Sequence, residues 1–114
     1  MLADKLEIAK WWTEKVVDVL RDEVLEVSLF GSVARGGDRE GSDVDILIIV
    51  SGERKKALDV LFDKLSDAFL ELAGKGVMVE NIVENVEEWE KMEEKGFSFV
   101  RNVKDERIVL YRRS

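Results

Sequence analysis

The sequence predicts a single α+β domain, residues 1–114, built on a mixed sheet of about four strands with helices mainly on one face. Three observations carry this prediction. Four short runs are rich in β-branched or aliphatic residues, as strands are, and two long segments repeat apolar residues at helical spacing. The chain has 114 residues, 46% of them hydrophobic, which suits one compact core.

The first half of the chain is expected to contain two helices and two strands. Residues 4–22 read as a helix with apolar residues every three or four positions. The adjacent Trp11 and Trp12 cannot both face inward, so Trp12 is placed on the core face and Trp11 at its rim. A β-branched and aromatic strand follows at 24–30, and the aliphatic run 46–50 is typical of a strand buried on both faces.

The second half is expected to start with a long helix at 53–73, whose apolar stripe covers the sheet. A strand follows at 77–83, and then a short acidic helix at 84–92. The residues after Gly96 form either a further short helix or an extended segment. The run 108–111 is expected to close the sheet as an edge strand.

Composition excludes several function classes. The formal net charge is −7 and no long basic run occurs, which argues against extensive nucleic-acid binding and against a templated polymerase. The chain has no cysteine and no histidine, so disulfides and Ser-His or Cys-His catalysis are excluded. The longest apolar run is too short to span a bilayer and no signal segment is visible, so we expect a cytoplasmic protein without membrane association.

Two aspartates, Asp43 and Asp45, stand at the start of the most apolar strand. Residues two apart in a strand point to the same side, about 7 Å apart along the backbone. Like charges so close together disfavour joint ionisation, so a cation is expected to share the site. Oxygen ligands suit Mg²⁺ or Mn²⁺, and the chain has no histidine or cysteine to favour zinc.

A glycine-rich connection precedes the aspartates and provides a candidate phosphate seat. Gly31 lets the backbone approach a ligand closely, Ser32 offers a hydroxyl and an N–H, and Arg35 can place its guanidinium on phosphate. A Gly-Ser pair or a Ser-Asp pair alone is an ordinary turn. Both together, beside two acids on one face of an aliphatic strand, indicate a functional site.

These two blocks, with their spacing, resemble the signature of the minimal nucleotidyltransferases, the smallest members of the DNA polymerase β-like superfamily. The matching residues are Gly31, Ser32, Arg35, Gly36, Ser42, Asp43 and Asp45. The resemblance implies transfer of a nucleoside monophosphate from a nucleoside triphosphate, with ATP as the expected donor, to a hydroxyl group with the help of two Mg²⁺ ions. It also implies nucleotide binding at Gly31, Ser32, Arg35, Gly36 and Ser42.

The family generally carries a third carboxylate on the strand beside the Asp-x-Asp strand. Glu80 is the candidate here, as a metal ligand and as the group that accepts the proton of the attacking hydroxyl. The family more often has aspartate at this place. Glu84, or a Glu80 that merely faces solvent, are therefore alternatives.

The chain is too short for a separate acceptor-binding domain, so a partner protein is expected to bring the acceptor. The resemblance implies a HEPN-domain toxin, adenylylated on a tyrosine, which makes this chain an antitoxin. One alternative is a module with a vestigial metal site that neutralises a basic toxin by binding it. Another is a small-molecule nucleotidyltransferase, for which a homodimer would have to build the cleft.

Overall fold

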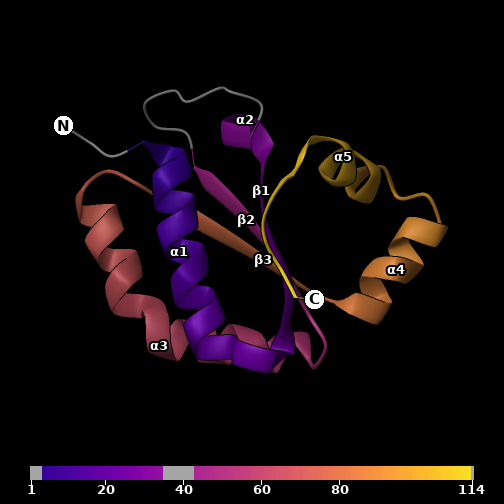
Figure 1. The fold of residues 1–114 in the computed structure, drawn as a ribbon, viewed down its shortest axis with the longest axis horizontal. Helices are drawn as coiled ribbons and strands as arrows, with labels where there is room; N and C mark the ends of the chain where they lie inside the picture. The colour runs from indigo at the N-terminus through magenta and orange to yellow at the C-terminus, as the bar shows by residue number, and fades with distance from the viewer. Residues whose placement is uncertain (1–3, 35–42, 114) are drawn as a thin grey trace.

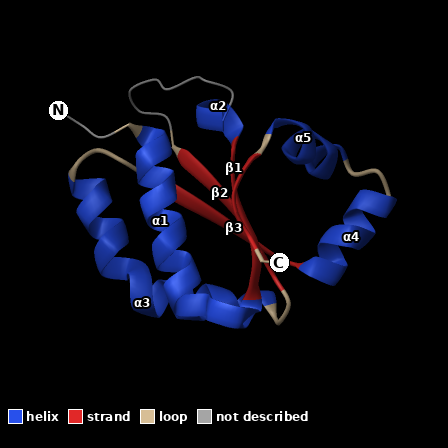
Figure 2. Ribbon diagram, viewed as in Figure 1, coloured by secondary structure: helices blue, strands red, loops and turns tan. Residues whose placement is uncertain are grey.

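The fold is a four-stranded mixed sheet with helices on both faces, described by a computed structural model for residues 4–34 and 43–113. Figure 1 shows the chain path and Figure 2 the helices and strands. The strands are β1 (Val24–Phe30), β2 (Val44–Val50), β3 (Val79–Asn85) and β4 (Ile108–Arg112). The helices are α1 (Lys5–Leu20), the 3-10 turn η1 (Arg21–Glu23), α2 (Gly31–Ala34), α3 (Arg54–Gly74), α4 (Val86–Glu94) and α5 (Ser98–Glu106).

The strand order is β3-β2-β1-β4, with β1 antiparallel to both β2 and β4 and β2 parallel to β3. The sheet is therefore mixed, and β4 lies at an edge, as predicted. The long helix α3 makes the crossover that a parallel pair of strands requires. As a result, β2 and β3 both begin at the end of the sheet where β1 finishes.

The two long helices cover one face of the sheet, on the left in Figure 1. Trp12 is 1% exposed on this face, whereas Trp11 is 36% exposed, as the helical spacing predicts. The Trp12 indole Nε1 donates a hydrogen bond of 2.9 Å to Asn81 Oδ1 on β3, which ties α1 to the sheet. Helix α1 begins at Lys5 because Asp4 caps it by accepting a hydrogen bond of 3.0 Å from Leu6 N–H.

A second, smaller cluster covers the other face, where α4 and α5 pack. Its buried members are Phe30, Leu47, Ile49, Trp89, Val100 and Val103. The long pair α1 and α3 holds most of the helical residues on one face, as expected, and the short pair adds a layer on the other. The segment after Gly96, for which the sequence left two conformations open, is the helix α5. Strand β2 is thus buried on both faces, as its aliphatic run predicts.

Among the described residues, no helix combines the length and the apolar character that crossing a membrane requires.

Candidate active site

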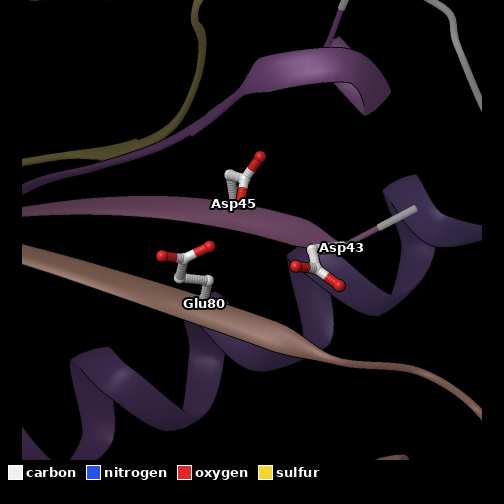
Figure 3. Close-up of side chains that lie close together, drawn as sticks. All are labelled: Asp43, Asp45 and Glu80. Atoms are coloured by element: carbon white, nitrogen blue, oxygen red, sulfur yellow. The ribbon is translucent and has the colours of Figure 1, made fainter. Parts of the chain in front are cut away.

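Three carboxylates gather where β2 and β3 begin. Asp45 and Glu80 are partners in the parallel register of these strands, and paired residues point to the same face of a sheet. Asp43 lies two residues before Asp45. One oxygen from each of the three side chains can be chosen so that all three lie within 4.8 Å of one another. Figure 3 shows the three side chains at this end of the sheet. The sheet register thus brings Glu80 to the aspartate pair.

The chemistry of this trio fits a divalent cation. Asp43 and Glu80 are exposed and Asp45 is half-buried. Among the residues that the structure describes, neither Asp43 nor Glu80 forms an ion pair with a lysine or arginine. Three anionic groups so close together repel one another, and a hard cation with oxygen ligands relieves this repulsion. Because two of the three ligands face solvent, such a cation would keep positions open for the oxygens of a phosphate ligand.

Gly31 is the residue at which the backbone meets the acidic trio. It follows the last residue of β1, has a positive φ of +76°, and opens α2. A Cβ on Gly31 would overlap Asp45 Oδ2 and would lie 3.2 Å from Asp45 Cγ. The sequence predicted that Gly31 makes room for a ligand. The structure adds that it makes room for the Asp45 carboxylate, which links the glycine turn to the acidic site.

The other predicted nucleotide-binding residues are only partly within the described structure. Ser32 lies in α2, directly beside Gly31, but its side chain is outside what the structure describes. Arg35, Gly36 and Ser42 lie outside the described residues. Their binding of nucleotide stays a prediction.

Glu84, the alternative third carboxylate, is not part of the trio. It is in register with Ile49, whereas Glu80 is in register with Asp45, so Glu84 lies farther along the same face of β3. The pKa of the Glu84 carboxyl is raised above its ordinary value, mainly by burial. The positive charge of Arg54 opposes this rise, and the negative charge of Glu88 adds to it. Arg54 begins α3 and Glu88 lies in the first turn of α4, so the charged neighbours of Glu84 lie at the end of the sheet opposite the trio.

Phe30 is a neighbour of the site that the sequence identified only as part of a strand. It pairs with Asp45 in the antiparallel register of β1 and β2, so both side chains are on the same face. Its ring packs edge-on against Phe99 of α5, with 6.2 Å between the ring centroids. Phe99 in turn packs edge-on against Trp89 of α4. These aromatic contacts fix α5 beside the acidic trio, and no local sequence pattern reveals the pairing.

The site and the fold together define a class of protein: a small α+β domain that presents an acidic cluster, able to hold a divalent cation, beside a glycine turn. The family model for the nucleotidyltransferase domain matches residues 13–110 of this chain. A Methanocaldococcus jannaschii protein named "putative protein adenylyltransferase" is 41% identical over 92 residues, which cover 80% of this chain and 82% of the relative. The chain therefore belongs to the nucleotidyltransferase domain family.

Two solved structures have the same fold. A crystal structure of a putative nucleotidyltransferase from Sulfolobus solfataricus is 23% identical, with a TM-score of 0.58 over 96% of this chain and 81% of that one. A crystal structure of a mutant of the toxin-antitoxin MntA-HpeT is 16% identical, with a TM-score of 0.59 over 92% of this chain and 74% of that one. At these identities the likeness concerns the fold.

Proposed function

We propose that this chain transfers AMP from ATP to a hydroxyl group of a partner protein, in a reaction that depends on divalent cations. The observation that carries the proposal is the convergence of Asp43, Asp45 and Glu80 beside the turn at Gly31. Membership of the nucleotidyltransferase family supports the reaction class. The name of the Methanocaldococcus relative supports an adenylyl group and a protein acceptor.

In the proposed reaction, the acceptor hydroxyl oxygen attacks the α-phosphorus of ATP, the bond from that phosphorus to the bridging oxygen breaks, and pyrophosphate leaves. Asp43, Asp45 and Glu80 would hold two Mg²⁺ ions, or Mn²⁺ in their place, which would supply charge neutralisation at the triphosphate and make the hydroxyl easier to deprotonate. Glu80, which is exposed on an edge strand, accepts the hydroxyl proton, because the chain has no histidine for this role.

Nucleotide binding is assigned to the glycine turn. Gly31 and Ser32 receive the triphosphate, and Arg35, Gly36 and Ser42 complete the contacts, as the resemblance to minimal nucleotidyltransferases implies. The position of Gly31 against Asp45 supports this assignment, because it brings the turn beside the cation ligands.

For the acceptor, we propose a tyrosine of a HEPN-type toxin, which would make this chain an antitoxin. The likeness of the fold to a chain of the toxin-antitoxin MntA-HpeT supports a toxin partner. A cytoplasmic location stays a prediction from the sequence, and a homodimer belongs only to the small-molecule alternative.

A direct test measures radioactive labelling of the purified partner protein with α-labelled ATP and Mg²⁺, together with neutralisation of the partner's toxicity. We expect labelling that EDTA abolishes, and loss of both labelling and neutralisation in Asp43→Asn. The matched control is Asp18→Asn, which removes an exposed carboxylate from α1, far from the acidic trio in the fold. It is expected to leave both readouts unchanged.

The same experiment separates the alternatives. If Asp43→Asn abolishes labelling but the partner is still neutralised, the chain acts as a binding module. If no protein is labelled and a small hydroxyl compound is adenylylated instead, the chain is a small-molecule transferase. Labelling that persists in EDTA and in Asp43→Asn would contradict the proposed role of the acidic trio.

A further inference from the structure

An apolar groove lies on the α1/α3 side of the sheet, between α3 and the edge strand β3. Its volume is about 700 Å³. Phe62 and Leu70 of α3 line it and are 80% and 64% exposed, the two highest values among the exposed large apolar side chains of the described residues. Asn81 of β3 and Trp12 of α1 also line it. Within the described part of the chain, nothing covers Phe62 or Leu70, so the groove is available to another molecule.

A row of acids runs along the exposed side of α3 and starts at the groove, which Asp59 lines. Asp59, Asp63, Asp67 and Glu71 are spaced four residues apart and are all exposed. Like charges at this spacing repel one another and destabilise a helix slightly. Lys64 lies 3.8 Å from Asp63, but Asp59 and Asp67 form no ion pair with any residue that the structure describes. Glu71, at the other end of the row, lies 3.8 Å from Lys75 and lines a different pocket, beside Trp11 of α1. The row thus leaves the negative charges of Asp59 and Asp67 uncompensated, and Asp59 lines the groove itself.

Strand β3 contributes residues both to the groove and to the acidic trio. Asn81 lines the groove, and the preceding residue, Glu80, belongs to the trio. Successive residues of a strand point to opposite faces, and β3 is an edge strand. Asn81 therefore faces the groove and Glu80 the opposite face of the same edge strand, so a molecule in the groove lies at the sheet edge that also carries Glu80.

We propose that this groove docks the acceptor protein through a segment that carries apolar side chains flanked by lysine or arginine. The proposal rests on the proposed transfer reaction and adds the surface that recognises the partner. Apolar anchors would fill the space between Phe62 and Leu70, and the basic residues would meet Asp59 and Asp67. A second copy of this chain fits less well, since a two-fold contact over α3 would set the acidic row against itself.

A binding experiment with defined probes tests the docking surface. The probes are two fluorescent amphipathic helical peptides of equal length, one of leucine and lysine and the other of leucine and glutamate, measured by anisotropy. We expect the leucine/lysine peptide to bind and the leucine/glutamate peptide not to bind. The double variant Phe62→Ser, Leu70→Ser should weaken binding of the leucine/lysine peptide by about tenfold or more, since central apolar anchors dominate such contacts.

Matched variants keep the test specific. Phe97→Ser removes a phenylalanine that is 49% exposed, directly before α5, and should leave peptide binding unchanged. Asp59→Asn with Asp67→Asn should weaken binding, whereas Glu87→Gln with Glu90→Gln, which removes two exposed acids from α4, should not. Asp43→Asn should bind the peptide as the unaltered chain does, so docking can succeed even if the proposed transfer reaction fails.

Three results would overturn the proposal. The first is equal binding of the two peptides, and the second is equal weakening by the α3 variants and their controls. The third is a dimer in sedimentation equilibrium that the double variant Phe62→Ser, Leu70→Ser dissociates, because the groove would then hold a second copy of the chain.

Discussion

The two ends of the β2/β3 strand pair both carry polar residues, but they use them in opposite ways. At the far end, where the strands finish, Asn85 Nδ2 donates to Gly52 C=O at 2.8 Å and its Oδ1 accepts from two N–H groups of α4. Arg54 Nε donates to the Val83 carbonyl at 2.7 Å. At the near end, Asp43, Asp45 and Glu80 instead bring three anionic groups together.

The polar residues of the far end stabilise the fold, whereas those of the near end are candidates for function. At the far end each donor meets an acceptor, so the polar groups stabilise the junctions between β2, α3, β3 and α4. At the near end three carboxylates converge instead, and a divalent cation would relieve the repulsion between them. Substitutions of the hydrogen-bonding residues at the far end should therefore lower stability, and substitutions in the acidic trio should lower activity.

The largest expected effect is on the activity of Asp45→Asn. This change removes one of the proposed cation ligands and should slow AMP transfer by at least about a hundredfold, a typical cost of losing one group that stabilises transition-state charge. The free energy of unfolding should change little by comparison, because asparagine has nearly the same shape as aspartate. Transfer rate and urea unfolding measure the two effects. A large loss of stability with activity retained would place Asp45 with the structural residues.

Gly31→Ala should affect both properties, because Gly31 joins the glycine turn to the acidic trio. A side chain at φ +76° costs about 1–3 kcal/mol in backbone strain, and the added Cβ overlaps the Asp45 carboxylate. We expect lower stability and a transfer rate reduced by about tenfold to a hundredfold, since displaced ligands lose their alignment. The matched control is Gly74→Ala, where a Cβ meets nothing within 4 Å. Equal behaviour of the two variants would contradict the role of Gly31.

Asn85→Ala should lower stability alone. The change removes the cap of α4, with hydrogen bonds of 2.9 and 3.2 Å to Glu87 and Glu88 N–H, and the bond to Gly52. Loss of a helix cap costs about 0.5–2 kcal/mol, and the transfer rate well below the melting temperature should not change. Asn102→Ala, an exposed asparagine on α5, is the control. A slower transfer reaction in Asn85→Ala would mean that the two ends of the sheet are coupled.

The sequence predicted most of the near end and little of the far end, for physical reasons. The aliphatic run of β2 and the spacing of Asp43 and Asp45 are local patterns, so they predict a strand with two acids on one side. The neighbouring Glu80 required the strand register, which only a family resemblance could supply. The close approach of Gly31 to Asp45 joins separate elements, and local periodicity carries no signal for it.

Local sequence patterns were also insufficient to predict the layer formed by α4 and α5. The acidic helix was expected at 84–92 and lies at Val86–Glu94, because Asn85 caps it and β3 extends to that residue. The sequence left the conformation of the next segment open, since its apolar residues find partners only on the distant strands β1 and β2. Contacts between such distant residues decide which of two weak local preferences is realised.

The smallest expected effect concerns Glu84, the acid of the far end. The pKa of its carboxyl is raised, mainly by burial, with Arg54 opposing the rise and Glu88 adding to it. A raised pKa means that the folded chain binds the proton more tightly than the unfolded chain. The stabilisation from this group is thus fully present below the ordinary value of 4.5 and is lost as the pH rises through the folded pKa.

Glu84→Gln should therefore remove this part of the pH dependence. In urea unfolding between about pH 4 and pH 7, the variant should lose less stability with rising pH than the unaltered chain. It should be at least as stable near neutrality, because the amide has no charge to desolvate. Glu87→Gln, an exposed acid of the same region, is the control and should keep the original slope. A steeper fall in Glu84→Gln would mean that the attraction of Arg54 outweighs burial, and that the far end pairs its charges fully.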